Sequence, residues 1–309
     1  MSLKIKDQMT DSAPKESVRT LLAEIIDYAG LFPPSQISMP EAVINYATYR
    51  NSNYSWMLGR FVVPVARLDE FIESAQDFVS RDGKSAWRLS VLAGEDIYET
   101  IRQIEDFNSK NAPRVICDTL EVRANTESKI ENTVNALPNF LTAYFEIPLD
   151  ERLPDIVTAL AIHKQRAKIR TGGITAEEFP STRAIIRFIR TCMAANVPFK
   201  ATAGLHHPLR CFKPLTYEAN APKGTMNGFL NLFLATGFAR AGYKPIILEE
   251  ILEDEFEESF EFTDNGIAWH GDYFLTTWQL GFVRQKSIVS FGSCSFTEPI
   301  ADLQEIGLL

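Results

Sequence analysis

Residues 166–204 read RAKIRTGGITAEEFPSTRAIIRFIRTCMAANVPFKATAG, which contains one complete strand–helix–strand unit. The short β-type runs at 167–172 and 199–204 predict strands, and the longer segment at 177–196 predicts a helix between them. A strand, a helix and a second strand in this order form a parallel pair joined by a crossover helix.

The same unit repeats along most of the chain. The expected strands lie near 28–32 and at 60–65, 87–93, 114–120, 141–147, 167–172, 199–204 and 287–293. Helical segments follow them, for example at 68–80, 96–110 and 297–307. About eight alternating units predict an α/β fold with a closed (β/α)8 TIM barrel. The alternative is an open doubly wound sheet, but no G-x-G-x-x-G motif follows any strand.

An insertion at 209–286 separates the seventh and eighth expected strands within what we expect to be a single domain, 1–309. It holds a strong helical run at 224–242 and a hairpin signal at 260–274, where Asp-Asn-Gly marks the turn. Because it leaves the end of a barrel strand, we expect the insertion to cap the catalytic side. Asn227 is then a candidate substrate contact, or else a polar group on a helix surface.

Composition limits the classes of partner. The net charge of −9 disfavours nucleic acid, and we find no apolar run that could span a membrane. The four cysteines show no CxxC spacing, and residues 1–17 lack the apolar core of a signal peptide, so we expect a cytoplasmic protein. The expected partner is a small-molecule substrate, with no cofactor or metal, and homo-oligomerisation stays open.

Two lysines are the main candidates for chemistry. Lys168 and Lys200 lie near the C-terminal ends of consecutive expected strands, where barrel enzymes place their sites. At equal height they would repel each other, which would lower the pKa of at least one and supply the neutral amine that a Schiff base requires. Glu146 or Asp118 would carry protons. Structural ion pairing of the same groups is the alternative reading.

Five segments, in order, resemble the deoxyribose-phosphate aldolase family of class I aldolases, which are barrels. They are Ile26–Pro33, Tyr144–Pro148, Lys168–Gly172, Phe199–Leu205 and Phe291–Phe296. The resemblance implies that Lys168 forms the Schiff base and Lys200 is the second lysine. It also implies that the last segment holds phosphate through its backbone. The chain departs from the family pattern at Arg170, at Tyr28-Ala29, at Phe296 and in the length of the insertion.

We therefore expect an aldolase-like carbon–carbon lyase that forms a Schiff base with a small, anionic carbonyl compound. The expected substrate-binding residues are Asp27, Arg170, Thr171, Thr202, His206, His207, Asn227, Gly292, Ser293 and Ser295. One alternative is a non-catalytic barrel that binds a sugar or an acid. The other is a metal-dependent aldolase or hydrolase that uses His206 and His207.

Overall fold

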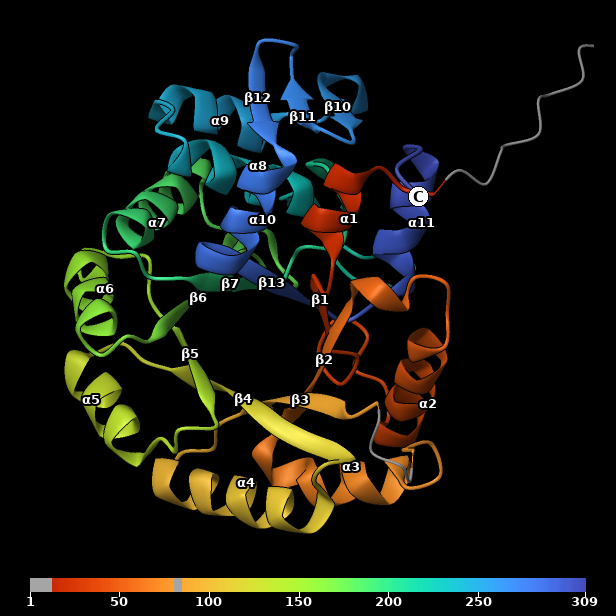
Figure 1. The fold of residues 1–309 in the computed structure, drawn as a ribbon, viewed down its shortest axis with the longest axis vertical. Helices are drawn as coiled ribbons and strands as arrows, with labels where there is room; N and C mark the ends of the chain where they lie inside the picture. The colour runs from red at the N-terminus through yellow and green to blue at the C-terminus, as the bar shows by residue number, and fades with distance from the viewer. Residues whose placement is uncertain (1–12, 81–84) are drawn as a thin grey trace, which may run out of the picture.

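A computed structural model describes residues 13–80 and 85–309, so most of the polar N-terminal stretch considered above lies outside the described residues. Eight parallel strands close into a barrel in the order β1-β13-β7-β6-β5-β4-β3-β2 (Figure 1). The barrel strands are β1 (Ile26–Tyr28), β2 (Leu58–Pro64), β3 (Trp87–Leu92), β4 (Val115–Arg123), β5 (Thr142–Glu146), β6 (Arg166–Arg170), β7 (Phe199–Thr202) and β13 (Ile288–Ser293). The predicted (β/α)8 TIM barrel is confirmed.

Helices surround this ring (Figure 1). Outside the long β7–β13 connection they are α1 (Glu16–Leu22), α2 (Met39–Arg50), α3 (Leu68–Ala75), α4 (Ile97–Asn111), α5 (Glu127–Ala136), α6 (Leu153–Ile162), α7 (Thr182–Ala194) and α11 (Thr297–Glu305). Short 3-10 turns occur at Ser55–Met57, Val65–Arg67, Ala176–Glu178 and Glu257–Ser259.

Helix α7 shows why these segments form. Ser181 caps its first turn by accepting a hydrogen bond from the amide of Ala184. Apolar residues at helical spacing then form a buried stripe that faces the barrel. Within that stripe Phe188 meets Phe199 of β7 edge to face, with ring centroids 5.0 Å apart. The contact holds β7, and with it Lys200, against the outer layer.

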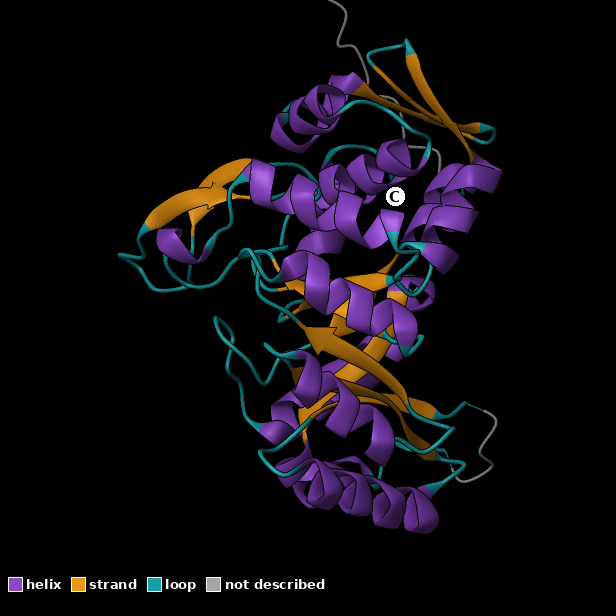
Figure 2. Ribbon diagram, turned by 90° about the vertical axis from the view of Figure 1, so that its left-hand side faces the viewer, coloured by secondary structure: helices purple, strands orange, loops and turns teal. Residues whose placement is uncertain are grey.

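The β7–β13 connection contains two small sheets and three helices. Its elements are β8 (Cys211–Pro214), β9 (Lys223–Met226), α8 (Phe229–Arg240), α9 (Pro245–Glu253), β10 (Phe260–Thr263), β11 (Gly266–Trp269), β12 (Tyr273–Thr276) and α10 (Thr277–Lys286). The expected hairpin is present, because β10 and β11 pair antiparallel around the predicted turn. Figure 2 shows the two small sheets at separate places on the molecule.

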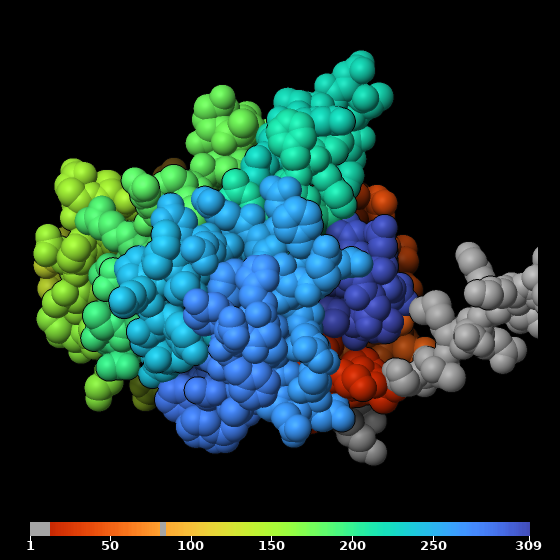
Figure 3. Space-filling model, turned by 90° about the horizontal axis from the view of Figure 1, so that it is seen from above, coloured from red at the N-terminus to blue at the C-terminus, as the bar shows by residue number. Residues whose placement is uncertain are grey.

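Helix α8, which we expected to lie over the mouth, lies with the outer helices instead. Phe229 at its start stacks on Phe291 of β13 at 4.9 Å. Phe291 points outward because its neighbour in β13, Ser290, bonds to Asp27 inside the barrel. The start of the connection does reach the mouth, since β9 contacts the turn at Ala176–Glu178 after β6. Seen from above in Figure 3, this teal segment projects beside the green β6–α7 segment.

Candidate active site

The two lysines are neighbours inside the barrel. Strands β6 and β7 pair so that Lys168 lies directly opposite Lys200. Both side chains are buried among the inward-facing residues. The expectation of equal height is therefore confirmed.

A carboxylate that the sequence analysis missed joins the two lysines. Glu121 on β4 places one oxygen, Oε2, 2.7 Å from Lys168 Nζ and the other, Oε1, 2.6 Å from Lys200 Nζ. The hydroxyl of Ser90 donates a further hydrogen bond of 2.6 Å to Oε1. The two lysines lower the pKa of Glu121 far below its usual range, although burial acts to raise it. Glu121 therefore stays an anion.

Asp27 completes the pairing of Lys200. Its Oδ2 lies 2.6 Å from Lys200 Nζ and accepts a 2.8 Å hydrogen bond from Ser290, while Oδ1 accepts one from the backbone amide of Arg60. Burial lowers the pKa of Lys200, but Asp27 and Glu121 raise it by more, so the net pKa lies above its ordinary value. Lys200 is therefore not a lysine whose pKa is lowered by its neighbour, because two carboxylates approach it and stabilise its charge. Asp27, which we expected to bind the substrate, is buried and bonded within this network.

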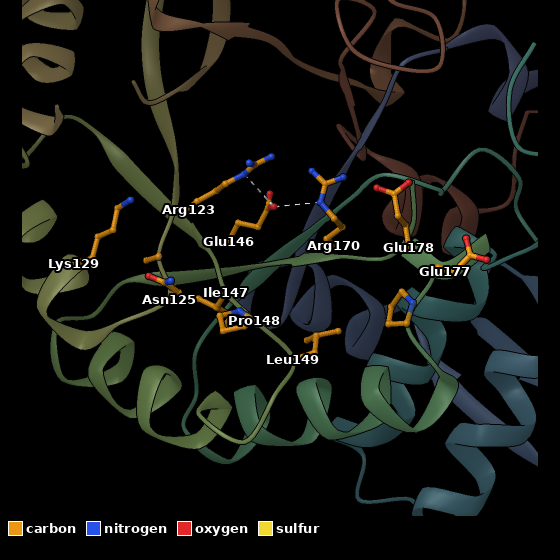
Figure 4. A pocket seen from close by; sticks show the side chains of 12 residues that line it. Arg123, Asn125, Lys129, Glu146, Ile147, Pro148, Leu149, Arg170, Glu177 and Glu178 are labelled. Carbon is orange, nitrogen blue, oxygen red and sulfur yellow. Dashed lines mark hydrogen bonds and ion pairs between the residues drawn. The ribbon is translucent and has the colours of Figure 1, made fainter. Parts of the chain in front are cut away.

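Glu146 connects the buried Lys168 to two more exposed arginines. Its Oε2 lies 2.9 Å from Lys168 Nζ, and its Oε1 accepts a hydrogen bond of 3.2 Å from Arg170 Nε. Arg123 approaches the same Oε1 at 3.6 Å (Figure 4). Burial raises the pKa of Glu146, but Lys168 and Arg170 outweigh it and leave the pKa below its usual value.

A cavity of about 570 Å³ opens beyond Glu146 at the C-terminal ends of β4, β5 and β6. Arg123 and Arg170 line it with Glu146 and converge on that carboxylate in Figure 4, with Lys129 farther out. The side chain of Arg123 is 79% exposed and that of Arg170 is 40% exposed. The cavity thus gives a solute access to two arginines and to the carboxylate that holds Lys168.

Asp118 does not lie beside the two lysines, so its predicted position in the site is wrong. It binds Arg60 at 2.6 Å and Arg88 at 2.8 Å, and Arg88 also reaches Glu24, which precedes β1. These partners lie toward the N-terminal end of the barrel. A register shift between β3 and β4 occurs beside Asp118, and Glu121 lies three residues, about 10 Å, farther along β4. Arg60 and Arg88 lower its pKa against the effect of burial.

The remaining candidates divide into mouth residues and structural residues. Thr202 lies at the mouth, paired with Gly292 of β13 and opposite Arg170 of β6. Thr171 is fully buried and donates to the carbonyl of Ala203, and its own carbonyl accepts a hydrogen bond from Asn227. Through these hydrogen bonds Thr171 and Asn227 fix the ends of β6 and β7.

The loop after β13 leads into helix α11. The amide of Ser295 donates to the hydroxyl of Ser293, and the hydroxyl of Ser295 accepts from the amide of Glu298. Ser295 thus acts as a cap for α11. The segment that we expected to bind an anion, Gly292–Ser295, therefore lies at the mouth of the barrel. Within it, the hydroxyl of Ser295 is already hydrogen-bonded to the amide of Glu298.

Two adjacent histidines follow β7. His206 Nδ1 lies 3.1 Å from Glu298, and His207 Nδ1 contacts Asp302 on the same helix. Over residues 13–80 and 85–309, no group of three or more histidine, cysteine or acidic side chains is arranged to hold a metal ion. The metal-dependent alternative therefore gains no support from these two residues.

The chain matches no protein-family model and no curated protein. The resemblance to class I aldolases accordingly stays an expectation drawn from the five sequence segments. Among the helices of the described part of the chain, none combines the length and the apolar character needed to cross a membrane.

Proposed function

We propose that the protein is an aldolase-like lyase in which Lys168 forms a Schiff base with a small, anionic carbonyl compound. One observation carries the proposal: Lys168 Nζ lies between two carboxylates, Glu121 at 2.7 Å and Glu146 at 2.9 Å, and the second carboxylate lines an open cavity. A buried amine with a proton acceptor at hydrogen-bond distance is what nucleophilic catalysis by lysine requires.

The first half of the reaction converts the amine to an imine. Lys168 passes a proton to Glu146 and adds to the carbonyl carbon, and the resulting carbinolamine loses water as Glu146 returns the proton to the departing hydroxyl. Lys168 is the cation that acts most strongly to lower the pKa of Glu146. As the lysine becomes neutral, this carboxylate therefore becomes a better proton acceptor.

The second half breaks a carbon–carbon bond. The hydroxyl on the β-carbon loses its proton to a carboxylate, the α–β bond breaks, and its electron pair moves into the iminium to give an enamine and a free aldehyde. The enamine is then protonated on carbon, and water hydrolyses the new iminium to release the second product and Lys168. The fixed anion Glu121 stabilises the iminium charge throughout.

Lys200 takes a different role from the one expected of it. It is held as a cation by Asp27 and Glu121, so it acts as the permanent counter-ion that keeps Glu121 ionised beside Lys168. Arg170 and Arg123 at the cavity are the groups that would hold the anionic end of the substrate.

Borohydride trapping tests the proposal. Incubation with a panel of small aldehydes and ketones and then borohydride is expected to leave one reduced adduct, which peptide mass spectrometry locates on Lys168. Lys168→Met abolishes the adduct, whereas Lys129→Met, which changes an exposed lysine of the same cavity, leaves it intact. Glu146→Gln slows trapping by about 10²-fold or more.

An adduct on Lys200, or no adduct with any carbonyl compound, would remove the proposal. The second result favours an anion-binding barrel without chemistry. That alternative is supported by the ion pairs that already occupy both barrel lysines while two arginines face the cavity. Titration with inorganic phosphate, followed by calorimetry, then measures the binding that Arg170 provides.

A further inference from the structure

A second cluster of reactive groups lies at the mouth, on the opposite side from the cavity. Cys294 directly follows β13, and its thiol interacts with the side chain of His206. His206 in turn bonds through Nδ1 to Glu298 at 3.1 Å. Tyr217 bridges the cluster, because its hydroxyl lies 3.8 Å from Cys294 Sγ and donates to the Glu298 carboxylate at 2.9 Å.

A carboxylate, an imidazole and a thiol in this order form the arrangement that activates a cysteine as a nucleophile. The carboxylate favours the imidazolium, and the imidazolium favours the thiolate. Burial lowers the pKa of His206, but Cys294 and Glu298 raise it by more, so that the net pKa is about 9. The titratable groups that act directly on the thiol are His206, Tyr217 and, from β1, Tyr28, while Glu298 acts on it through His206 and Tyr217.

At each of the other three cysteines burial sets the direction of the pKa shift. Burial raises the pKa of Cys117 and of Cys192 above their ordinary values. Burial also raises the pKa of Cys211, to about 11, although this residue is more exposed than Cys294. Cys211, the more exposed thiol, can therefore serve as an internal control for Cys294, the thiol paired with His206.

We propose that Cys294 is a peroxide-reactive thiolate, with His206 as its proton donor and Glu298 as the residue that positions the imidazole. The thiolate sulfur attacks one oxygen of a hydroperoxide, the O–O bond breaks, and a cysteine sulfenic acid forms as sulfur is oxidised by two electrons. The departing hydroxide or alkoxide takes a proton from the His206 imidazolium and leaves as water or an alcohol.

The size of the site selects the oxidant. Cys294 as a whole is 6% exposed, which favours a small hydroperoxide over a bulky electrophile as its reaction partner. The hydroxyl of Tyr217, near Sγ, can stabilise the sulfenic acid by hydrogen bonding. This reaction does not use Lys168, so it stands or fails independently of the Schiff-base proposal.

Brief treatment of the native protein with hydrogen peroxide, followed by removal of the oxidant and unfolding in the presence of dimedone, tests the inference, because dimedone then reaches every sulfenic acid that has formed. Peptide mass spectrometry at pH 7 is expected to show labelling of Cys294 at least about tenfold faster than that of Cys211, because only the thiolate reacts. If exposure alone governed the reaction, Cys211 would react first, and that result would overturn the proposal.

Two histidine variants separate the mechanism from a general effect on structure. His206→Gln is expected to slow labelling of Cys294 at pH 7 by about tenfold or more. His207→Gln changes the adjacent histidine, which bonds to a different carboxylate, Asp302. This substitution is expected to change the labelling rate of Cys294 less than twofold. Cys117 and Cys192 stay unlabelled in every folded variant because both are fully buried. Equal effects of the two substitutions in folded protein would refute the role of His206.

Discussion

Replacement of Lys200 by methionine tests whether the barrel interior is held by charge pairing. Lys200 is 2% exposed and lies 2.6 Å from Asp27 and 2.6 Å from Glu121. Removing one partner of a buried ion pair costs about 3–5 kcal/mol, because the remaining charge is left without compensation. Glu121 keeps Lys168, and Asp27 keeps the hydrogen bond from Ser290, so we expect a loss near 3 kcal/mol at pH 7.

The loss should depend on pH with a definite sign. In the native protein the pKa of Glu121 is depressed, so its contribution to stability is present above its unfolded pKa and lost as the pH falls. The contribution of Lys200, whose pKa is raised, is complete at neutral pH. Removing Lys200 raises the pKa of Glu121. The deficit of the variant is therefore largest near pH 7 and shrinks below about pH 4.5, where carboxylates become protonated.

Urea unfolding followed by both circular dichroism and tryptophan fluorescence measures this loss, with coincident transitions as the condition for a free energy. Lys129→Met is the matched control, because that lysine is exposed, and it should change stability by less than about 0.5 kcal/mol. Asp27→Asn added to Lys200→Met should restore about 1 kcal/mol by removing the uncompensated anion. A loss below 1 kcal/mol at pH 7, or one equally large at pH 4, would refute the reasoning.

Three further predictions concern other parts of the barrel. Arg170→Ala should weaken binding of inorganic phosphate at least about tenfold by calorimetry, and unchanged affinity would place the anion elsewhere. Asp118→Asn should lower stability by about 1–3 kcal/mol, since Arg60 and Arg88 lose charge compensation, yet leave borohydride trapping unchanged; reduced trapping would return Asp118 to the site. The raised pKa of His206 implies stability that is complete below about pH 6.5 and lost as the pH rises through about 9. Thermal unfolding of His206→Gln should therefore show a deficit at pH 6 that disappears by pH 10.

The sequence predicts the barrel well because alternation of short strands and amphipathic helices is a local signal. It also predicts that Lys168 and Lys200 are neighbours, since both lie at similar positions in consecutive strands. The predicted strand at 114–120 is too short, however, because β4 continues to Arg123. Glu121 was therefore missed, although an acidic residue within a long strand run, two after Thr119, was a visible sign of an inward-facing charge.

The direction in which the pKa of Lys200 shifts could not be predicted from the local sequence. Its two carboxylate partners lie 173 and 79 residues away along the chain, on β1 and β4. The place of Asp118 likewise depends on a register shift between β3 and β4, which no sequence pattern marks. A prediction of pKa direction needs all charged neighbours, and these are brought together only by closure of the barrel.

The strength of pairing falls steadily from the centre of the barrel to the cavity, and this gradient supports the proposal that Lys168 is the reactive lysine. Lys200 has two carboxylates at 2.6 Å and is 2% exposed, so it cannot give up its charge cheaply. Arg170 at the cavity is 40% exposed and reaches Glu146 at 3.2 Å, so it is free to exchange that partner for a ligand. Lys168 lies between these extremes, 6% exposed and 2.9 Å from the same Glu146. An anion that draws Arg170 away from Glu146 would leave that carboxylate as the proton acceptor of Lys168. In the proposed reaction, binding of the anionic end of the substrate and activation of the amine are therefore coupled through Glu146.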